Sequence, residues 1–301
     1  MANQFPKVIR QFALCIKSRM KAVIMIYGWL SVISLFITFR GLPPPILLLK
    51  VFFAMTGTAF GVYFYNDICD LKDDLSIGEI VELTPASRPL GRGLVSKRRM
   101  GIFSALMVAL GLTASALINI DVFLIQLLFL ILGLFYSTEP IRLKRFFLTK
   151  QVLIAIGGAI ACLTAGLAAG IITVQLLYMA GLYVLFSAGA SPLVDIKDME
   201  TDRIGRVKTI PLIWGPEFTI RLALATFTAS AVTTWIGFYG LGFNIVLPIL
   251  GTVVLASLVY VIYPLLDNLG DREYVFKVLR GRFLPLFFIL QIVVLVGSLP
   301  L

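Results

Sequence analysis

The feature that most constrains the fold is a series of nine apolar stretches separated by short polar segments. A helix needs about 20 mostly apolar residues to cross about 30 Å of hydrocarbon. Only 14% of the residues are charged and 59% are apolar, whereas soluble domains are about a quarter charged. The sequence therefore predicts an all-α polytopic membrane protein with nine transmembrane helices at about 22–39, 46–65, 101–118, 122–137, 152–172, 174–193, 219–239, 243–264 and 283–301.

Several classes of chemistry are excluded because the chain has no histidine and only three scattered cysteines, Cys15, Cys69 and Cys162. Without histidine there is no Ser-His-Asp triad and no HExxH zinc site. Three cysteines suit neither a disulfide framework nor a zinc site. The apolar composition argues against nucleic-acid binding, and the N-terminus lacks the features of a cleavable signal peptide. Any reaction must therefore use carboxylates, amides, hydroxyls, Arg, Lys or Tyr.

The 26 Lys and Arg residues orient the spans. All but Arg40 and Lys50 fall in the N-terminal stretch or in the segments 66–100, 138–151, 194–221 and 265–282. With nine spans, these five basic segments lie on one side of the membrane, and the positive-inside rule makes that side cytoplasmic. We therefore expect an integral protein of the cell membrane whose N-terminus and polar loops are cytoplasmic.

The N-terminal stretch Phe5–Lys21 mixes apolar residues with five cations. One interpretation is an amphipathic helix that lies on anionic lipid headgroups. An equally good interpretation is that the stretch is the charged flank of the first span. The sequence leaves both open.

Two acidic motifs share the pattern Asp-x-x-Asp-x-x-x-Asp, and each follows an even-numbered span. The first motif, which begins with an amide, consists of Asn66, Asp67, Asp70 and Asp74. The second motif consists of Asp195, Asp198 and Asp202. The repetition suggests a single transmembrane domain over residues 1–301, with two related halves at about 22–137 and 152–264 and a ninth helix at 283–301.

The spacing within each motif has a chemical consequence. Positions i, i+3 and i+7 share one face of a helix, so each motif stacks three carboxylates on one stripe. Like charges at a membrane boundary repel strongly, and the cluster needs cations to compensate it. Carboxylate and amide oxygens suit Mg²⁺, which commonly bridges carboxylates to substrate phosphates. A solvated acidic helix end could explain one such motif, but it explains two matched motifs in a charge-poor chain poorly.

Cationic residues lie close in sequence to both acidic motifs. One group contains Arg88, and the other contains Tyr136, Arg142 and Lys144. Arginine binds phosphate oxygens in a bidentate manner, and lysine acts as a point charge. Acidic clusters beside such cations are what a Mg²⁺–diphosphate complex requires, although basic cytoplasmic loops alone could explain the second group.

These motifs resemble those of the UbiA superfamily of intramembrane aromatic prenyltransferases. The similar segments are Asn66-Asp67-x-x-Asp70-x-x-x-Asp74, Arg88-Pro89-Leu90, Tyr136-Ser137-x-x-Pro140-x-Arg142-Leu143-Lys144 and Asp195-x-x-Asp198-x-x-x-Asp202. The resemblance covers nearly the whole chain, although Thr201 stands where the family usually has glycine. It implies nine helices around a central cavity that is capped by cytoplasmic loops and opens sideways to lipid.

The resemblance also implies roles for individual residues. Two Mg²⁺ ions would be held by Asn66, Asp70 and Asp74 on one side and by Asp198 and Asp202 on the other. Asp67 and Asp195 would support them, and either is a possible catalytic base, with the released diphosphate an equal candidate. The diphosphate would be held by Arg142, Lys144 and Lys197, together with Arg88 and Tyr136.

The expected activity is Mg²⁺-dependent transfer of a polyprenyl group from an isoprenyl diphosphate to a lipophilic acceptor within the membrane, with an aromatic quinone precursor as the first candidate. Geranylgeranylglyceryl phosphate, as in archaeal lipid synthesis, and a chlorin or haem are alternatives. A secondary transporter also has repeats and intramembrane acids, but here the acidic motifs lie at helix ends. A CDP-alcohol phosphotransferase lacks support because no Asp-Gly dipeptide opens either motif. A lipid-binding scaffold would leave the paired motifs unexplained.

Overall fold

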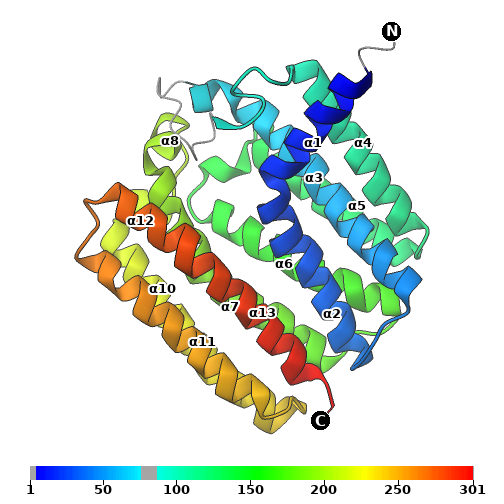
Figure 1. Cartoon of the computed structure of the whole chain (residues 1–301), viewed down its shortest axis with the longest axis vertical. Coiled ribbons are helices and arrows are strands. Elements are labelled where there is room, and N and C mark those ends of the chain that lie inside the picture. The colour runs from blue at the N-terminus through cyan, green and yellow to red at the C-terminus, as the bar shows by residue number, and fades with distance from the viewer. Residues whose placement is uncertain (1–4, 76–86, 301) are drawn as a thin grey trace.

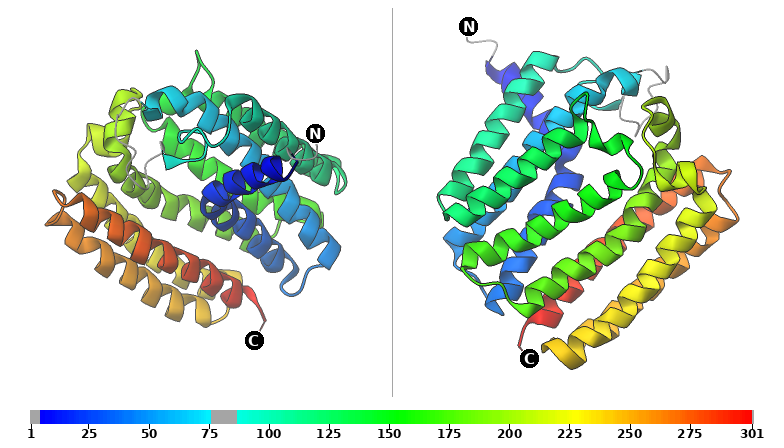
Figure 2. Two further views of the ribbon diagram at one scale, coloured as in Figure 1. Left: turned by 45° about the horizontal axis from the view of Figure 1, so that its top comes forward. Right: turned by 180° about the vertical axis from the view of Figure 1, so that it is seen from behind.

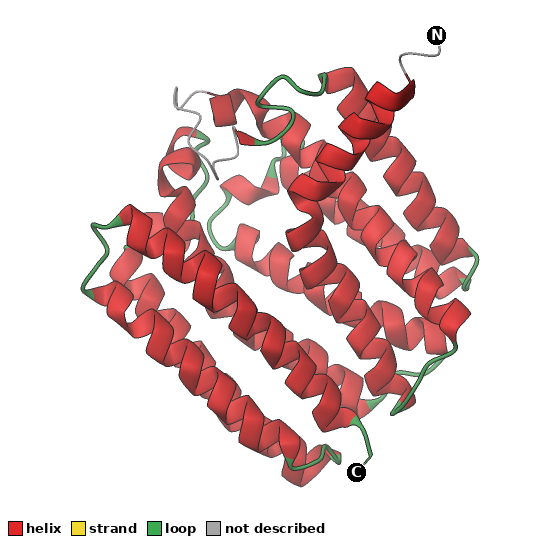
Figure 3. Ribbon diagram, viewed as in Figure 1, coloured by secondary structure: helices red, strands yellow, loops and turns green. Residues whose placement is uncertain are grey.

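The computed structural model describes residues 5–75 and 87–300. Over these ranges the chain is helical and contains no strand (Figure 3). The described residues include nine helices that are long and apolar enough to cross a membrane, which confirms the predicted number of spans. They run over Pro6–Phe39, Pro45–Asp73, Lys97–Ala116, Ile120–Ser137, Thr149–Ala169, Val174–Ile204, Pro216–Leu241, Val246–Leu266 and Glu273–Ser298.

Several spans are built from more than one helical element. The α-helices are α1 (Phe5–Ala22), α2 (Trp29–Phe39), α3 (Pro45–Leu75), α4 (Lys97–Ala116), α5 (Ile120–Ser137), α6 (Thr149–Ala169), α7 (Val174–Asp195), α8 (Met199–Ile204), α9 (Ile210–Ile213), α10 (Pro216–Leu241), α11 (Val246–Ile262), α12 (Arg272–Val278) and α13 (Leu284–Ser298). Two π-helical segments, η1 (Val23–Gly28) and η6 (Leu279–Phe283), join α1 to α2 and α12 to α13. Three 3₁₀ segments are η3 (Leu143–Arg145), η4 (Ile196–Asp198) and η5 (Tyr263–Leu266).

The spans pack side by side, and the start of α1 and the end of α13 lie at opposite ends of the bundle (Figure 1). Helix α3 packs along α4 and α5, and α6 lies against α2, α5 and α7. Helices α10, α11 and α13 continue the bundle from α7 and return to α2. Seen from behind, the teal helix α4 and the yellow and orange helices α10 and α11 occupy opposite flanks (Figure 2).

The N-terminal helix α1 is continuous with the first span rather than separate from it. Helix α1 passes through the π-helical segment η1 into α2 without a loop, and Figure 1 shows a bend at this point. Insertion of a π-helical turn is a known cause of such bends. Cys15 and Arg19 on α1 are buried, and the rings of Phe12 and Phe103 lie 5.0 Å apart. The inner face of α1 therefore packs against the bundle, a contact that neither interpretation of the sequence included.

The acidic motifs lie on different kinds of backbone. Helix α3 runs beyond the second predicted span to Leu75, so the first motif is helical throughout. The second motif is not one helical stripe: Asp195 ends α7, Asp198 ends the 3₁₀ segment η4, and Asp202 lies on α8. The predicted single stripe is wrong here because the chain tightens into η4 after Asp195, which turns the residues that follow out of the helical register of α7.

Helices α3 and α4 approach closely through glycine, and this contact allows a test. A Cβ atom on Gly57 would lie 2.7 Å from the backbone nitrogen of Gly111, which cannot move aside like a flexible side chain. We expect Gly57→Ala to lower the free energy of unfolding by about 1–3 kcal/mol. The matched control is Gly181→Ala, because nothing lies within 4 Å of a Cβ there. Thermal unfolding in detergent should show a lower Tm for Gly57→Ala only; equal Tm values would contradict the packing argument.

Candidate active site

The first acidic motif presents its amide and one carboxylate at the end of α3. The Asn66 side chain donates hydrogen bonds to Oδ2 of Asp70, at 2.9 Å, and to Oγ of Ser137, at 2.8 Å. Ser137 is the last residue of α5, so this network ties α3 to the start of the loop that follows α5. Asn66 is therefore held in a fixed orientation with its oxygen available.

Asp67 points to a different set of partners. Its side chain is buried, and its carboxylate accepts hydrogen bonds from Nε of Arg19 at 3.1 Å and from Nη1 of Arg88 at 2.9 Å. The Arg19 guanidinium also lies over the ring of Tyr63, 5.1 Å from its centroid. A buried charge needs partners, and the Asp67 carboxylate has two arginines. It therefore links the N-terminal helix α1 to Arg88.

The loop between α5 and α6 brings two cations to Asp70. Nη2 of Arg142 lies 2.9 Å from Oδ1 of Asp70 and 2.6 Å from Oδ2 of Asp73, and Lys144 forms an ion pair with the same Asp70 oxygen. Burial alone lowers the pKa of Arg142, but its hydrogen bonds to Asp73 and Asp70 raise the pKa above its ordinary value. For Lys144, burial outweighs the attraction of Asp70, so its pKa is lowered. Both cations are buried, and Arg142 adopts a left-handed backbone conformation with φ of 34°.

The second motif is organised by Lys150, at the start of α6. Its Nζ lies 3.0 Å from Oδ1 of Asp195 and 3.0 Å from Oδ2 of Asp202. Asp195 is buried and also accepts a hydrogen bond from Nε2 of Gln151 at 2.9 Å. Asp198 pairs instead with Lys197, at 2.7 Å. One lysine therefore holds together two of the three carboxylates of the motif.

The two motifs face a common polar cavity of about 600 Å³. Its lining contains oxygen ligands from both motifs and cations from the intervening segments: Asn66, Asp70, Asp73, Arg88, Tyr136, Arg142, Lys144, Lys150, Asp198 and Asp202. Residues of both motifs therefore line one cavity.

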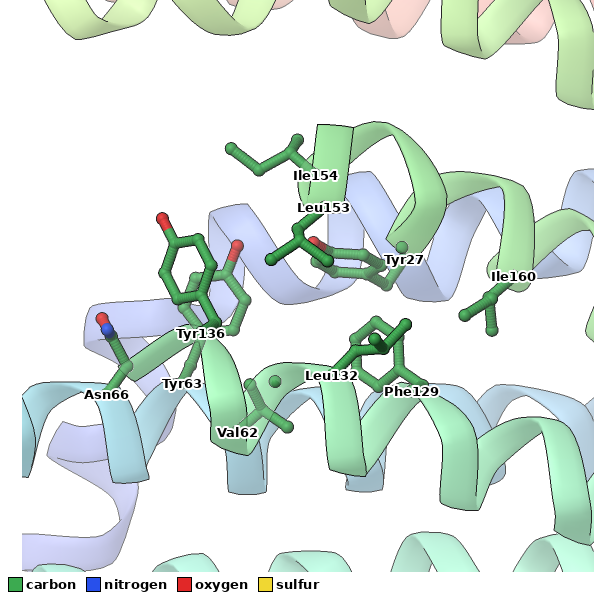
Figure 4. Close-up of a pocket in the computed structure, with 12 residues that line it drawn as sticks. Tyr27, Val62, Tyr63, Asn66, Phe129, Leu132, Tyr136, Leu153, Ile154 and Ile160 are labelled. Carbon is green, nitrogen blue, oxygen red and sulfur yellow. The ribbon is translucent and has the colours of Figure 1, made fainter. Parts of the chain in front are cut away.

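An apolar cavity of about 680 Å³ adjoins the polar one. Asn66 and Tyr136 line both cavities, so they lie at the boundary between them. Figure 4 shows this apolar cavity between α6 on one side and α3 and α5 on the other, with Asn66 and Tyr136 at one end and Phe129 and Ile160 at the other. A molecule with a charged head and an apolar tail matches this pair of cavities.

The structure brings together most, but not all, of the predicted site residues. Asp67, Asp195 and Lys197 do not belong to the lining of the polar cavity, although each pairs with a residue that does. Asp74 lies on α3, and its side chain is outside the part of the structure that is described. The sequence interpretation missed Lys150, Gln151, Asp73 and Arg19. Lys150 lies in a basic segment that membrane topology alone could explain. Only its contacts with Asp195 and Asp202 reveal its place in the site.

The donor set fits a divalent cation, but within the described residues no three acidic side chains are already gathered around one point. Instead, Asp70, Asp198 and Asp202 are each paired with lysine or arginine. These are hard oxygen ligands of the kind that Mg²⁺ prefers. A cation–diphosphate complex carries charges of both signs, so it can replace these pairs: its metal meets the carboxylates and its phosphates meet the Lys and Arg side chains.

Comparison with known proteins gives the family. The sequence model of the UbiA prenyltransferase family matches residues 27–288. Digeranylgeranylglyceryl phosphate synthase of Sulfurisphaera tokodaii is 29% identical over 205 residues, which cover 67% of this chain and 69% of that protein. The 34 kDa chain of bacteriochlorophyll synthase of Chloroflexus aurantiacus is 29% identical over 190 residues, which cover 63% of this chain and 58% of that protein.

Solved structures show the same fold. A structure described as digeranylgeranylglyceryl phosphate synthase in membranes matches with a TM-score of 0.71 and 22% identity, over 98% of this chain and 99% of the other. A UbiA homologue from Archaeoglobus fulgidus, solved with GPP and Mg²⁺, matches with a TM-score of 0.70 and 17% identity, over 95% and 99% of the two chains. The chain therefore belongs to the UbiA prenyltransferase family, and it is a prenyl-transferring enzyme of the membrane.

Proposed function

We propose that this enzyme transfers a prenyl group from an isoprenyl diphosphate to a lipophilic acceptor, with Mg²⁺ as cofactor. The observation that carries the proposal is the shared boundary of the two cavities at Asn66 and Tyr136. A diphosphate placed among the cations of the polar cavity puts its tail in the apolar cavity. The C–O bond that joins the prenyl tail to the diphosphate then lies at the boundary between the two cavities. The basic segments around the polar cavity favour a cytoplasmic location for it.

The proposed metal ligands are the oxygen groups that line the polar cavity. Asn66 and Asp70 would hold one ion, with Asp74 assigned to the same ion by the family resemblance, and Asp198 and Asp202 would hold a second. Mg²⁺, when bound, supplies the positive charge that neutralises the diphosphate as a leaving group. Arg142, Lys144, Lys150 and Arg88 would receive the phosphate oxygens, with Tyr136 beside Lys144, whose Nζ lies 5.8 Å from the centre of the Tyr136 ring. Lys197 is a weaker candidate for binding the phosphate oxygens because it does not line the polar cavity.

The reaction begins when the C–O bond of the donor breaks and leaves an allylic cation next to the diphosphate. Fixed charges that favour this separation lower the barrier, because they need no reorganisation as charge develops. The nucleophilic atom of the acceptor then bonds to C1 of the cation and releases a proton. Asp67 and Asp195 are engaged by Arg19, Arg88, Lys150 and Gln151. We therefore propose that the released diphosphate accepts the proton and that Asp67 and Asp195 position Arg88 and Lys150.

For the acceptor, we propose a prenylated glyceryl phosphate. Digeranylgeranylglyceryl phosphate synthases of Sulfurisphaera tokodaii and of Thermococcus sibiricus are both similar to this chain. This acceptor stood second to an aromatic quinone precursor in the sequence interpretation. A chlorin is the second candidate, because bacteriochlorophyll synthase chains are also similar.

The proposal is tested with purified protein in liposomes. Labelled geranyl or geranylgeranyl diphosphate is offered with geranylgeranylglyceryl phosphate, 4-hydroxybenzoate or a chlorin, each with Mg²⁺ and with EDTA. We expect a lipid product with the glyceryl phosphate acceptor and only background with EDTA. Product from 4-hydroxybenzoate or the chlorin alone would overturn the acceptor assignment, and transfer unaffected by EDTA would overturn the role of the metal.

A further inference from the structure

An open cavity of about 1330 Å³, which we name the α1–α4 pocket, lies between the beginnings of α1 and α4. Its lining comes from the first turns of these two helices and from the segment that leads into α4. Figure 1 shows α1 and α4 beginning at the same end of the bundle. The α1–α4 pocket shares no lining residue with either cavity of the active site, so it is a separate feature of the molecule.

The charges that line the α1–α4 pocket are all positive. Lys7, Arg98 and Arg99 belong to the lining, and among the residues that the structure describes no carboxylate does. The active site is different, because its lysine and arginine side chains pair with aspartates. Cations gathered in one concave surface repel one another and create a positive potential there. An anion that enters the pocket relieves this repulsion, so the pocket favours a negatively charged ligand.

A buried amide on α1 holds one of these cations in place. Gln11 is only 9% exposed, and its Nε2 donates a hydrogen bond to the carbonyl oxygen of Leu94 at 2.6 Å. Its Oε1 accepts a hydrogen bond from Nη1 of Arg99, also at 2.6 Å. A guanidinium group has five N–H donors, so this bond orients Arg99 and engages one of them. A cation that is already oriented loses less conformational entropy when a ligand binds.

The α1–α4 pocket continues into an apolar stripe on α4. Its lining includes Ile102, which begins a row with Leu106 and Leu110 at intervals of four residues, and such residues share one face of a helix. The three side chains are 50%, 58% and 43% exposed. The span on α4 begins at Lys97, so the cations lie where the helix meets the headgroup layer and the stripe faces the hydrocarbon. A ligand with an anionic head and an apolar chain matches this arrangement.

We propose that the α1–α4 pocket binds the phosphate headgroup of an anionic membrane lipid. The phosphate oxygens accept hydrogen bonds from Arg98, Arg99 and Lys7, because arginine binds phosphate in a bidentate manner and lysine acts as a point charge. The lipid chain then lies along Ile102 and Leu106. Since the cations come from both α1 and α4, the bound lipid links the two helices. This role is independent of the transfer reaction, because the pocket is separate from the active site.

The test measures thermal unfolding of the full chain in a neutral detergent while dihexanoyl phosphatidylglycerol is added. A ligand that binds only the folded protein raises its Tm with a saturable dependence on concentration. We expect such a rise with phosphatidylglycerol and a smaller one with dihexanoyl phosphatidylcholine, whose headgroup has no net charge. Equal shifts with the two lipids would overturn the proposal. An equal shift with inorganic phosphate would also overturn it, because the ligand would then be a free anion rather than a lipid.

Two matched variants distinguish the pocket from general attraction to a basic surface. Lys7→Gln/Arg98→Gln removes two exposed cations of the lining and should weaken the apparent affinity for phosphatidylglycerol by about tenfold or more. Arg10→Gln/Lys97→Gln removes two exposed cations from the same turns but outside the lining, and should leave the affinity within about twofold.

Because all four side chains are exposed, both variants should unfold at the wild-type Tm when no lipid is added. An equal loss of affinity in the two variants would overturn the proposal, since the attraction would then come from the whole basic surface. Wild-type affinity in Lys7→Gln/Arg98→Gln would overturn it as well.

Discussion

Asp70→Asn and Asp198→Asn are each expected to lower kcat/KM for prenyl transfer by about 10³-fold, while the protein stays folded. The two carboxylates come from different motifs and line the same polar cavity. Asparagine keeps the size of the side chain but removes the negative charge that would hold a divalent ion. Rates are measured in liposomes with saturating Mg²⁺, and folding is followed by thermal unfolding in detergent.

The matched control for these variants is Asp121→Asn. Asp121 lies in the first turn of α5, whereas Tyr136, at the boundary of the polar cavity, lies in the last turn of the same helix. This substitution should leave the rate at the wild-type value. Retained transfer in both Asp70→Asn and Asp198→Asn would show that the two motifs do not jointly hold the diphosphate complex, and a loss with Asp121→Asn would point to a general effect on folding.

Lys150→Met is expected to reduce both stability and activity. The ammonium group lies between Asp195 and Asp202, and all three side chains are largely buried. Removing one member of a buried ion pair typically costs about 3–5 kcal/mol, because the remaining charge has no partner. We expect a clearly lower Tm and loss of most activity, whereas Lys50→Met, at a lysine that contacts the carbonyl oxygen of Leu117, should have a small effect.

A double-mutant cycle shows whether the stability loss arises from this ion pair. In Lys150→Met/Asp195→Asn the unpaired buried carboxylate is removed, so part of the lost Tm should return. Such coupling is the measure of a direct interaction. If the two substitutions add without coupling, Lys150 does not stabilise the site through Asp195.

The sequence predicted the parts of the molecule that depend on local pattern. Apolar length gave the nine spans, and the spacing of Asp67, Asp70 and Asp74 placed the first motif at the end of a helix. Charge distribution placed Arg142 and Lys144 on the same side as that motif, and both line the polar cavity. The relation between the two halves of the chain stays a prediction.

The remaining features depend on contacts between distant segments. In the sequence, Lys150 is one of several cations beside a predicted span. Only the packing of α6 against α7 shows that it joins Asp195 to Asp202. Arg19 reaches Asp67 because α1 continues through η1 at a bend that no residue pattern marked. The second motif departs from a single stripe because the backbone changes to a 3₁₀ turn between Asp195 and Asp202.

The pairing of Asp70, Asp198 and Asp202 with lysine and arginine has a thermodynamic consequence for the order of substrate loading. A divalent ion that bound alone would displace the ammonium and guanidinium groups from the carboxylates and leave these cations without a nearby anion. A diphosphate that bound alone would lie next to the negatively charged carboxylates. Each ligand should thus raise the affinity for the other by an equal factor. The resting enzyme would then discriminate against free Mg²⁺ and against free inorganic phosphate, and would respond to the two ligands as one neutralised unit.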